Sequence, residues 1–145
     1  MNKATPTLRD FAGRLMELEA KAIPSSEAQL PVAFLVCEKL RSHMTTLMGK
    51  TGFRALLTRS LVLGAAEVPW LATITVGADG AWRGLEESDG VDDPARAAEG
   101  GVVLLARLLG LLTAFIGGDL TLRLIREIWP ELTLDDLDLK PGDDR

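Results

Sequence analysis

The residues at 49–52 read GKTG, which matches the end of a phosphate-binding loop. A complete loop of that kind carries another glycine five positions before Gly49, where this chain has Met44. The loop must also follow a buried strand, whereas residues 32–48 place their apolar side chains at helical spacing. We therefore interpret Gly49 as the end of one helix and Lys50 as part of a short turn into the next.

A local excess of basic residues surrounds this turn. Between residues 39 and 59 there is no Asp or Glu, and the basic residues are Lys39, Arg41, Lys50, Arg54 and Arg59. Free backbone N–H groups at the start of a helix attract anions, and positive side chains nearby add to that attraction. The sequence therefore predicts a binding site for an anion or another small ligand at Lys50, Thr51 and Arg54.

A second candidate for ligand binding is Arg107, the single charged residue of the apolar run at 100–118. A buried arginine needs a partner, because an unpaired charge in the interior is strongly destabilising. Glu38, Glu67, Glu127 or a second copy of the chain can supply that partner, and the sequence does not choose between them. The alternatives are an arginine that reaches solvent along its aliphatic stem, or one that clamps a ligand's carboxylate or phosphate.

The same apolar run is long enough to cross a bilayer, but its arginine and its five glycines oppose insertion. We expect instead a helix that is covered on all sides, either in the middle of a bundle or at a contact with another chain. Helical spacing collects small residues on one side of this helix, where a second helix can approach closely. The residues predicted to form such an interface are Val103, Gly110, Ala114 and Gly117.

No set of residues with the spacing of a catalytic or metal site stands out. Cys37 and His43 lie six positions apart, on different sides of a helix, and do not form a nucleophile–base pair. One cysteine and one histidine do not supply the three or four ligands of a zinc site. The acidic stretches at 86–93 and 134–144 lack the spacing of a calcium loop. We predict no catalytic residue, no metal and no cofactor.

The overall composition limits the class of partner. The chain has 145 residues, a net charge of −5 and an isoelectric point near 4.9. Nucleic-acid binding requires many phosphates to be neutralised, so this charge balance opposes it. The one cysteine cannot form an internal disulfide, and the N-terminal residues show no apolar secretory run. We therefore expect a cytoplasmic protein.

The spacing of apolar residues predicts helices over most of the chain. The predicted helices run from Pro6 to about Ala22, from residues 29–31 to Gly49 or Gly52, from there to Val68, from Pro94 to about Ile116, and from Gly117 to Pro130, the last as a separate helix or a kinked extension. Alternating residues at 71–76 and 81–85 flank Asp79-Gly80 and predict a β-hairpin. Two strands alone are marginally stable, so the hairpin must pack on the helices or on a partner.

These patterns predict a mainly α fold of the α+β type. We expect one domain over 1–145, a compact bundle of four to five helices with one β-hairpin inserted at about residues 71–85, and a disordered tail at 141–145. The predicted function is a non-catalytic interaction or regulatory module. It would oligomerise or dock a protein partner through the apolar helix at 100–118 and the hairpin. The alternative is a sensor or carrier of a small apolar or anionic ligand, and an enzyme has the thinnest support.

Overall fold

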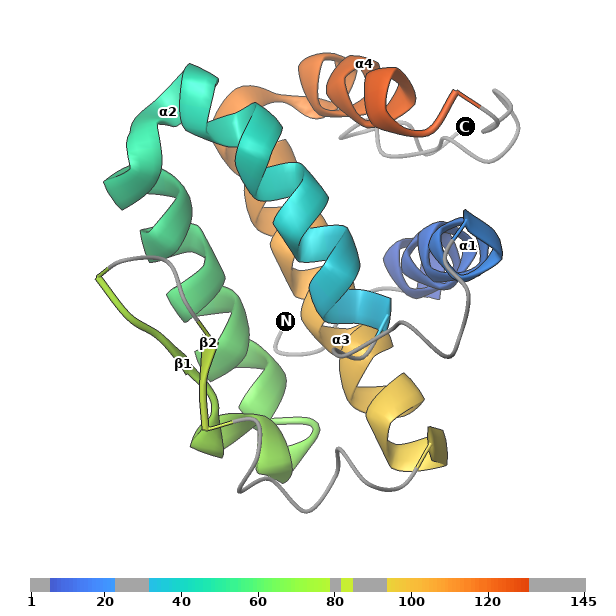
Figure 1. Cartoon of the computed structure of the whole chain (residues 1–145), viewed down its shortest axis with the longest axis vertical. Helices are drawn as coiled ribbons and strands as arrows, with labels where there is room; N and C mark the ends of the chain where they lie inside the picture. The colour runs from blue at the N-terminus through green and yellow to red at the C-terminus, as the bar shows by residue number, and fades with distance from the viewer. Residues whose placement is uncertain (1–5, 23–31, 79–81, 85–93, 131–145) are drawn as a thin grey trace.

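The computed structural model of the chain describes residues 6–22, 32–78, 82–84 and 94–130. These residues form a mainly helical bundle with a two-stranded antiparallel hairpin inserted between the helices (Figure 1). The predicted fold class is therefore confirmed. The tail predicted to be disordered, at 141–145, lies outside the described residues.

The helices begin and end close to the positions expected from their capping and breaking residues. Helix α1 spans Pro6–Ala22, α2 spans Val32–Ala65, α3 spans Pro94–Ile116 and α4 spans Gly118–Ile128. A short 3-10 helix, η2, spans Pro69–Thr73 and precedes strands β1 (Thr75–Val76) and β2 (Trp82–Arg83). Proline stands first in both α1 and α3, where its fixed φ suits the helix and its missing N–H costs nothing.

Helix α2 consists of two helical arms joined by a bend at Gly49. We call residues 32–48 the first arm and residues 50–65 the second arm. Gly49 has φ 81° and ψ 161°, a conformation that is essentially restricted to glycine. The chain reverses direction there, so the two arms lie beside each other (Figure 1). The helix break predicted at Gly49 or Gly52 therefore occurs at Gly49.

Helix α3 lies in the middle of the bundle, where it packs against α1 and both arms of α2 (Figure 1). Its bulky side supplies five leucines with no exposed surface: Leu104, Leu105, Leu108, Leu109 and Leu112. By length and composition alone, the segment Ala95–Ile116 could cross a membrane, and half of its apolar window is buried within the fold. A core helix passes the same test of length and composition, and in this fold the leucines named above are buried against the other helices.

The small residues of α3 allow its neighbours to approach the helix backbone. A Cβ atom added at Gly100 would lie 2.3 Å from the ring of Trp70. One added at Gly101 would lie 2.6 Å from the Cβ of Ala33 and 3.2 Å from the Cε of Met16. These close approaches take place inside one chain, with Gly100 against η2 and Gly101 against α1 and α2, and neither glycine is among the four residues predicted to form an interface.

The hairpin is shorter than predicted. Thr75 pairs with Arg83 and Val76 with Trp82, and residues 71–73 belong to η2 and not to the first strand. The reason is Pro69, which starts a 3-10 turn in which the Leu71 N–H donates to a carbonyl three residues earlier. The predicted turn at 79–80 and the rest of the second predicted strand, residues 81 and 85, lie outside the described residues.

A buried carboxylate connects three helices at one end of the bundle. Glu19 of α1 is 1% exposed, and its Oε1 atom lies 2.8 Å from the Nζ of Lys39 in the first arm of α2. The same oxygen accepts a hydrogen bond of 3.2 Å from the indole Nε1 of Trp129, which comes directly after α4. Because a buried charge is tolerated only when it is paired, this cluster fixes α1 and α4 against α2.

Candidate functional site

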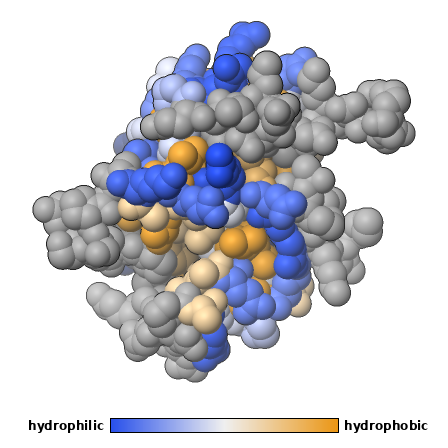
Figure 2. All heavy atoms as spheres, turned by 90° about the vertical axis from the view of Figure 1, so that its right-hand side faces the viewer, coloured by the Kyte–Doolittle hydropathy of each residue, from blue (hydrophilic) through white to orange (hydrophobic). Residues whose placement is uncertain are grey.

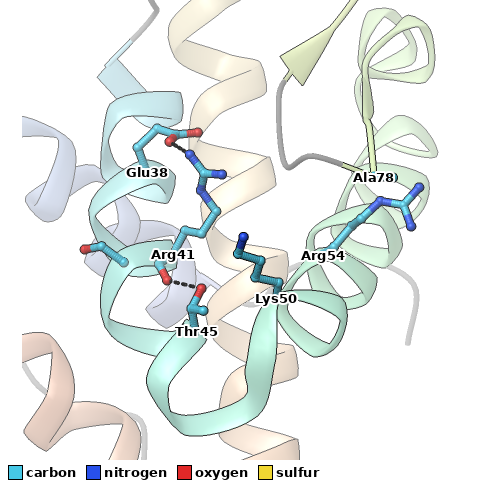
Figure 3. Close-up of a pocket in the computed structure, with 7 residues that line it drawn as sticks. Glu38, Arg41, Thr45, Lys50, Arg54 and Ala78 are labelled. Carbon is cyan, nitrogen blue, oxygen red and sulfur yellow. Dashed lines mark hydrogen bonds and ion pairs between the residues drawn. The ribbon is translucent and has the colours of Figure 1, made fainter.

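A pocket of about 420 Å³ lies at the bend of α2, between its two arms and the start of the hairpin turn (Figure 3). It is lined by Glu38, Arg41, Ser42, Thr45, Lys50, Arg54 and Ala78. In Figure 3, Arg41 and Lys50 extend from opposite arms into the space between them. Arg54 extends from the second arm toward the hairpin beside Ala78. Most of the lining side chains are charged or carry a hydroxyl group.

Helical spacing and the bend at Gly49 together build this pocket. On the first arm, Glu38, Arg41 and Thr45 follow one another at intervals of three and four residues and therefore share a face. On the second arm, Lys50 and Arg54 lie four residues apart and share a face for the same reason. Because the chain reverses direction at the glycine, the two polar faces are turned toward one space.

Glu38 is the acidic residue of the pocket, and its charge is already compensated. Its Oε1 atom is paired with the guanidinium of Arg41 on the same arm. Its Oε2 atom accepts a hydrogen bond of 2.7 Å from the indole Nε1 of Trp82. The ring of Trp82 also packs on Phe34, with centroids 4.7 Å apart. These contacts fix the second strand of the hairpin to the first arm.

The two cations of the second arm have no carboxylate partner among the described residues. No ion pair involves the ammonium group of Lys50 in that part of the chain. Arg54 donates from Nε to the backbone carbonyl of Val76 at 3.0 Å, which positions its guanidinium against β1. Its two terminal nitrogens form no ion pair within the described residues. Within the described part of the chain, the pocket therefore contains two positive charges without a carboxylate partner.

Two of the three residues predicted to bind an anion at this turn line the pocket. Lys50 and Arg54 do so, whereas Thr51 is exposed and is absent from its wall. Arg41 and Glu38 were missed by the sequence interpretation. The spacing on the first arm was the signal that could have found them, but only after the two arms were known to face each other.

Arg107, the other predicted ligand-binding residue, lies away from this pocket and is paired inside the bundle. Its Nε donates to Oε2 of Glu67 at 3.0 Å, and its Nη2 lies 2.7 Å from the same oxygen. Arg9 of α1 pairs with the other carboxylate oxygen of Glu67. The side chains of Arg107 and Glu67 are only 10% and 8% exposed. Of the partners that the sequence left open, the structure therefore assigns Glu67.

The four residues predicted to form an interface fall into two groups. Val103 is 1% exposed, and the Cδ1 atom of Leu8 would lie 3.3 Å from a Cβ added at Gly110. Val103 is therefore covered by other parts of the same chain, and Leu8 lies against part of Gly110. Ala114 is exposed, whereas Gly110 and Gly117 are partly exposed, so these three keep accessible surface.

Cys37 and His43 do not form a reactive pair in the structure. Cys37 is fully buried, and desolvation raises the pKa of its thiol far above the ordinary value, with a further contribution from Glu38. Because the thiolate is the nucleophilic form, this side chain acts as a core residue. His43 is exposed, with Nδ1 lying 3.1 Å from the carbonyl of Lys39. Within the described ranges, no group of three or more His, Cys, Asp and Glu side chains is placed to hold a metal.

Comparisons with known proteins add no assignment to this geometry. No protein-family model matches the chain, and neither the curated proteins nor the solved structures contain a significant match to it.

Proposed function

We propose that this chain is a non-catalytic binding protein that holds a small anionic ligand in the pocket at the bend of α2. The observation that carries the proposal is the pair of cations, Lys50 and Arg54, which line a pocket without a carboxylate partner in the described part of the chain. Lys50 extends into the space between the arms and Arg54 lies along the hairpin side of the pocket, and cationic side chains of this kind provide charge-assisted hydrogen bonds to an anion. This is the ligand-binding alternative of the sequence interpretation, now attached to a defined pocket.

Charge and size favour a small anion over a nucleic acid. The chain has a net charge of −5, so a polyanion would be repelled by most of the molecule while two cations attracted it. A volume of about 420 Å³ lies in the range typical of small-molecule pockets. The side chains of the wall include no histidine or cysteine that would form a nucleophile–base pair, which favours binding without catalysis. A cytoplasmic location remains part of the proposal.

The first test is a phosphate titration of the native chain and of a double variant, followed by amide chemical shifts in NMR spectra. Inorganic phosphate is expected to shift the amides of residues 49–54 in the native chain. Lys50→Gln combined with Arg54→Gln is expected to weaken that binding at least about tenfold, because two charge-assisted contacts are lost.

The matched control for this titration is Arg59→Gln. Arg59 is an exposed arginine of the same second arm, and it does not line the pocket. This variant removes a positive charge from the arm but none from the pocket, so it should bind phosphate with nearly native affinity. Equal weakening by Arg59→Gln would point to general charge attraction, and an absence of shifts at 49–54 in the native chain would refute the anion site.

A second candidate function is self-association through the C-terminal end of α3. Phe115 is 66% exposed there, next to the exposed Ala114 of the predicted interface. Figure 2 shows one face of the molecule, on which apolar side chains reach the surface between hydrophilic ones. Large exposed apolar side chains often mark contacts between proteins, which is why we keep a second copy of this chain as a candidate partner.

Light scattering after size-exclusion chromatography tests this second candidate. The native chain is expected to show a mass above the 15.6 kDa of one copy, and Phe115→Ser is expected to shift it toward the monomer. Val62→Ser is the control, because Val62 is 59% exposed but belongs to the second arm of α2. A native chain that stays monomeric at high concentration would exclude the self-association.

A further inference from the structure

We propose that the ligand of the α2 pocket is a phosphate monoester that carries hydroxyl groups, that is, a small polyol phosphate. The inference rests on the proposed anion-binding function and narrows it to a chemical class. It comes from the two arms of α2, whose side chains offer different hydrogen-bonding groups to the same space.

Apart from the guanidinium of Arg41, the first arm presents two hydroxyl oxygens whose protons are already used within the helix. Thr45 uses its hydroxyl proton in a bond of 2.7 Å to the carbonyl of Arg41, and Ser42 uses its proton in a bond of 2.9 Å to the carbonyl of Lys39. A hydroxyl group has one proton and two lone pairs, so each oxygen keeps the capacity to accept. His43 Nδ1 lies 3.3 Å from the Ser42 oxygen, which makes Thr45 the less encumbered acceptor.

The second arm presents donors only. The ammonium of Lys50 has three N–H groups and no lone pair, and the terminal nitrogens of the Arg54 guanidinium donate as well. A group that faces this arm must accept hydrogen bonds, and two cations without a carboxylate partner among the described residues favour a doubly charged group. A phosphate monoester carries close to two negative charges at neutral pH, whereas a carboxylate carries one. The second arm therefore favours a phosphate over a carboxylate.

A ligand group that bonds to the hydroxyl oxygens of the first arm must donate a hydrogen bond, and it need not carry a positive charge. Glu38 would attract an ammonium group if its carboxylate were free, but Arg41 already neutralises it and Trp82 binds its second oxygen. The acceptor that remains best placed is the uncharged oxygen of Thr45, whose natural donor is a hydroxyl group. A ligand with a phosphate group at one end and a hydroxyl group at the other is a polyol phosphate.

Isothermal titration calorimetry of the full chain tests the inference with three probes: glycerol 3-phosphate, n-propyl phosphate and glycerate. Glycerol 3-phosphate is expected to bind about three- to tenfold more tightly than propyl phosphate, since one neutral hydrogen bond is gained. Glycerate is expected to bind more weakly than glycerol 3-phosphate, because it carries one negative charge. In Thr45→Val the advantage of glycerol 3-phosphate over propyl phosphate should disappear.

Two further variants keep the test decisive. Thr58→Val is the control, since Thr58 is exposed on the second arm outside the pocket and should leave the ratio of affinities unchanged. Thr45→Ala replaces Thr45→Val if the latter fails to fold, since it removes the same hydroxyl group. Equal affinity of the native chain for the two phosphates would overturn the polyol inference and leave the anion site intact. Failure of all three probes and of inorganic phosphate would refute both proposals.

Discussion

Replacing Arg107 with leucine is expected to lower the free energy of unfolding by about 3 kcal/mol, near the lower end of the ~3–5 kcal/mol found when one member of a buried ion pair is removed. The variant leaves the buried Glu67 without its pair to Arg107, while the pair between Glu67 and the partly exposed Arg9 is retained. Retention of Arg9 places the expected loss at the lower end of the range. Urea unfolding followed by tryptophan fluorescence measures the change.

Two companion variants identify the cause of that loss. Arg9→Leu should cost less than about 1 kcal/mol, because its side chain is 40% exposed and water can replace much of the pair. Glu67→Leu combined with Arg107→Leu should recover a large part of the stability, because no buried charge then lacks a partner. An Arg107→Leu variant as stable as the native chain would contradict the structural role and revive the ligand-clamping role considered from the sequence.

Replacing Gly101 with valine is expected to lower the free energy of unfolding by about 2–3 kcal/mol, in the upper part of the range for overpacked cores. The new Cβ would lie 2.6 Å from the Cβ of Ala33, an atom attached directly to the backbone of α2 and unable to rotate away. The helices α2 and α3 must therefore separate to accommodate it. Thermal unfolding followed by circular dichroism, together with urea unfolding, measures the loss.

Gly13→Ala is the control for this prediction. Gly13 lies inside α1, and a Cβ added there meets no atom within 4 Å. Alanine is the better helix former, so this variant should be more stable than the native chain by about 0.5–1 kcal/mol. Opposite signs for the two substitutions would show that contact with α2, and not helix propensity, sets the cost at Gly101. A Gly101→Val variant of native stability would contradict the close packing.

The parts of the fold that were predicted correctly depend on local signals. Pro6 and Pro94 mark the starts of α1 and α3 because a proline acts within its own helical turn. Gly49 was predicted to end a helix for a similarly local reason, its tolerance of positive φ. The first strand was predicted to begin at residue 71, but Pro69 starts a 3-10 turn that extends to Thr73. In that turn Leu71 is buried and Ala72 is exposed, which is the alternation that a strand would also show.

Only part of the candidate site could be predicted from the sequence. Lys50 and Arg54 were found because they lie in a stretch rich in positive charge, which is visible along the chain. The contributions of Arg41 and Thr45 depend on the relative rotation of the two arms, which is set by packing on α3. The ion pair between Arg107 and Glu67 depends on where Glu67 lies after the end of α2, and no local sequence pattern encodes that position.

The bend at Gly49 also limits how the chain can change in length. A single residue joins the two arms, so no flexible loop separates their faces. Each residue inserted in a helix rotates the rest of the chain beyond it by about 100°, given 3.6 residues per turn. One residue inserted between Thr45 and Gly49 would therefore turn the second arm's cations away from the first arm's oxygens, even with every side chain of the pocket retained. Insertions and deletions in this segment are for that reason more damaging to the pocket than single substitutions.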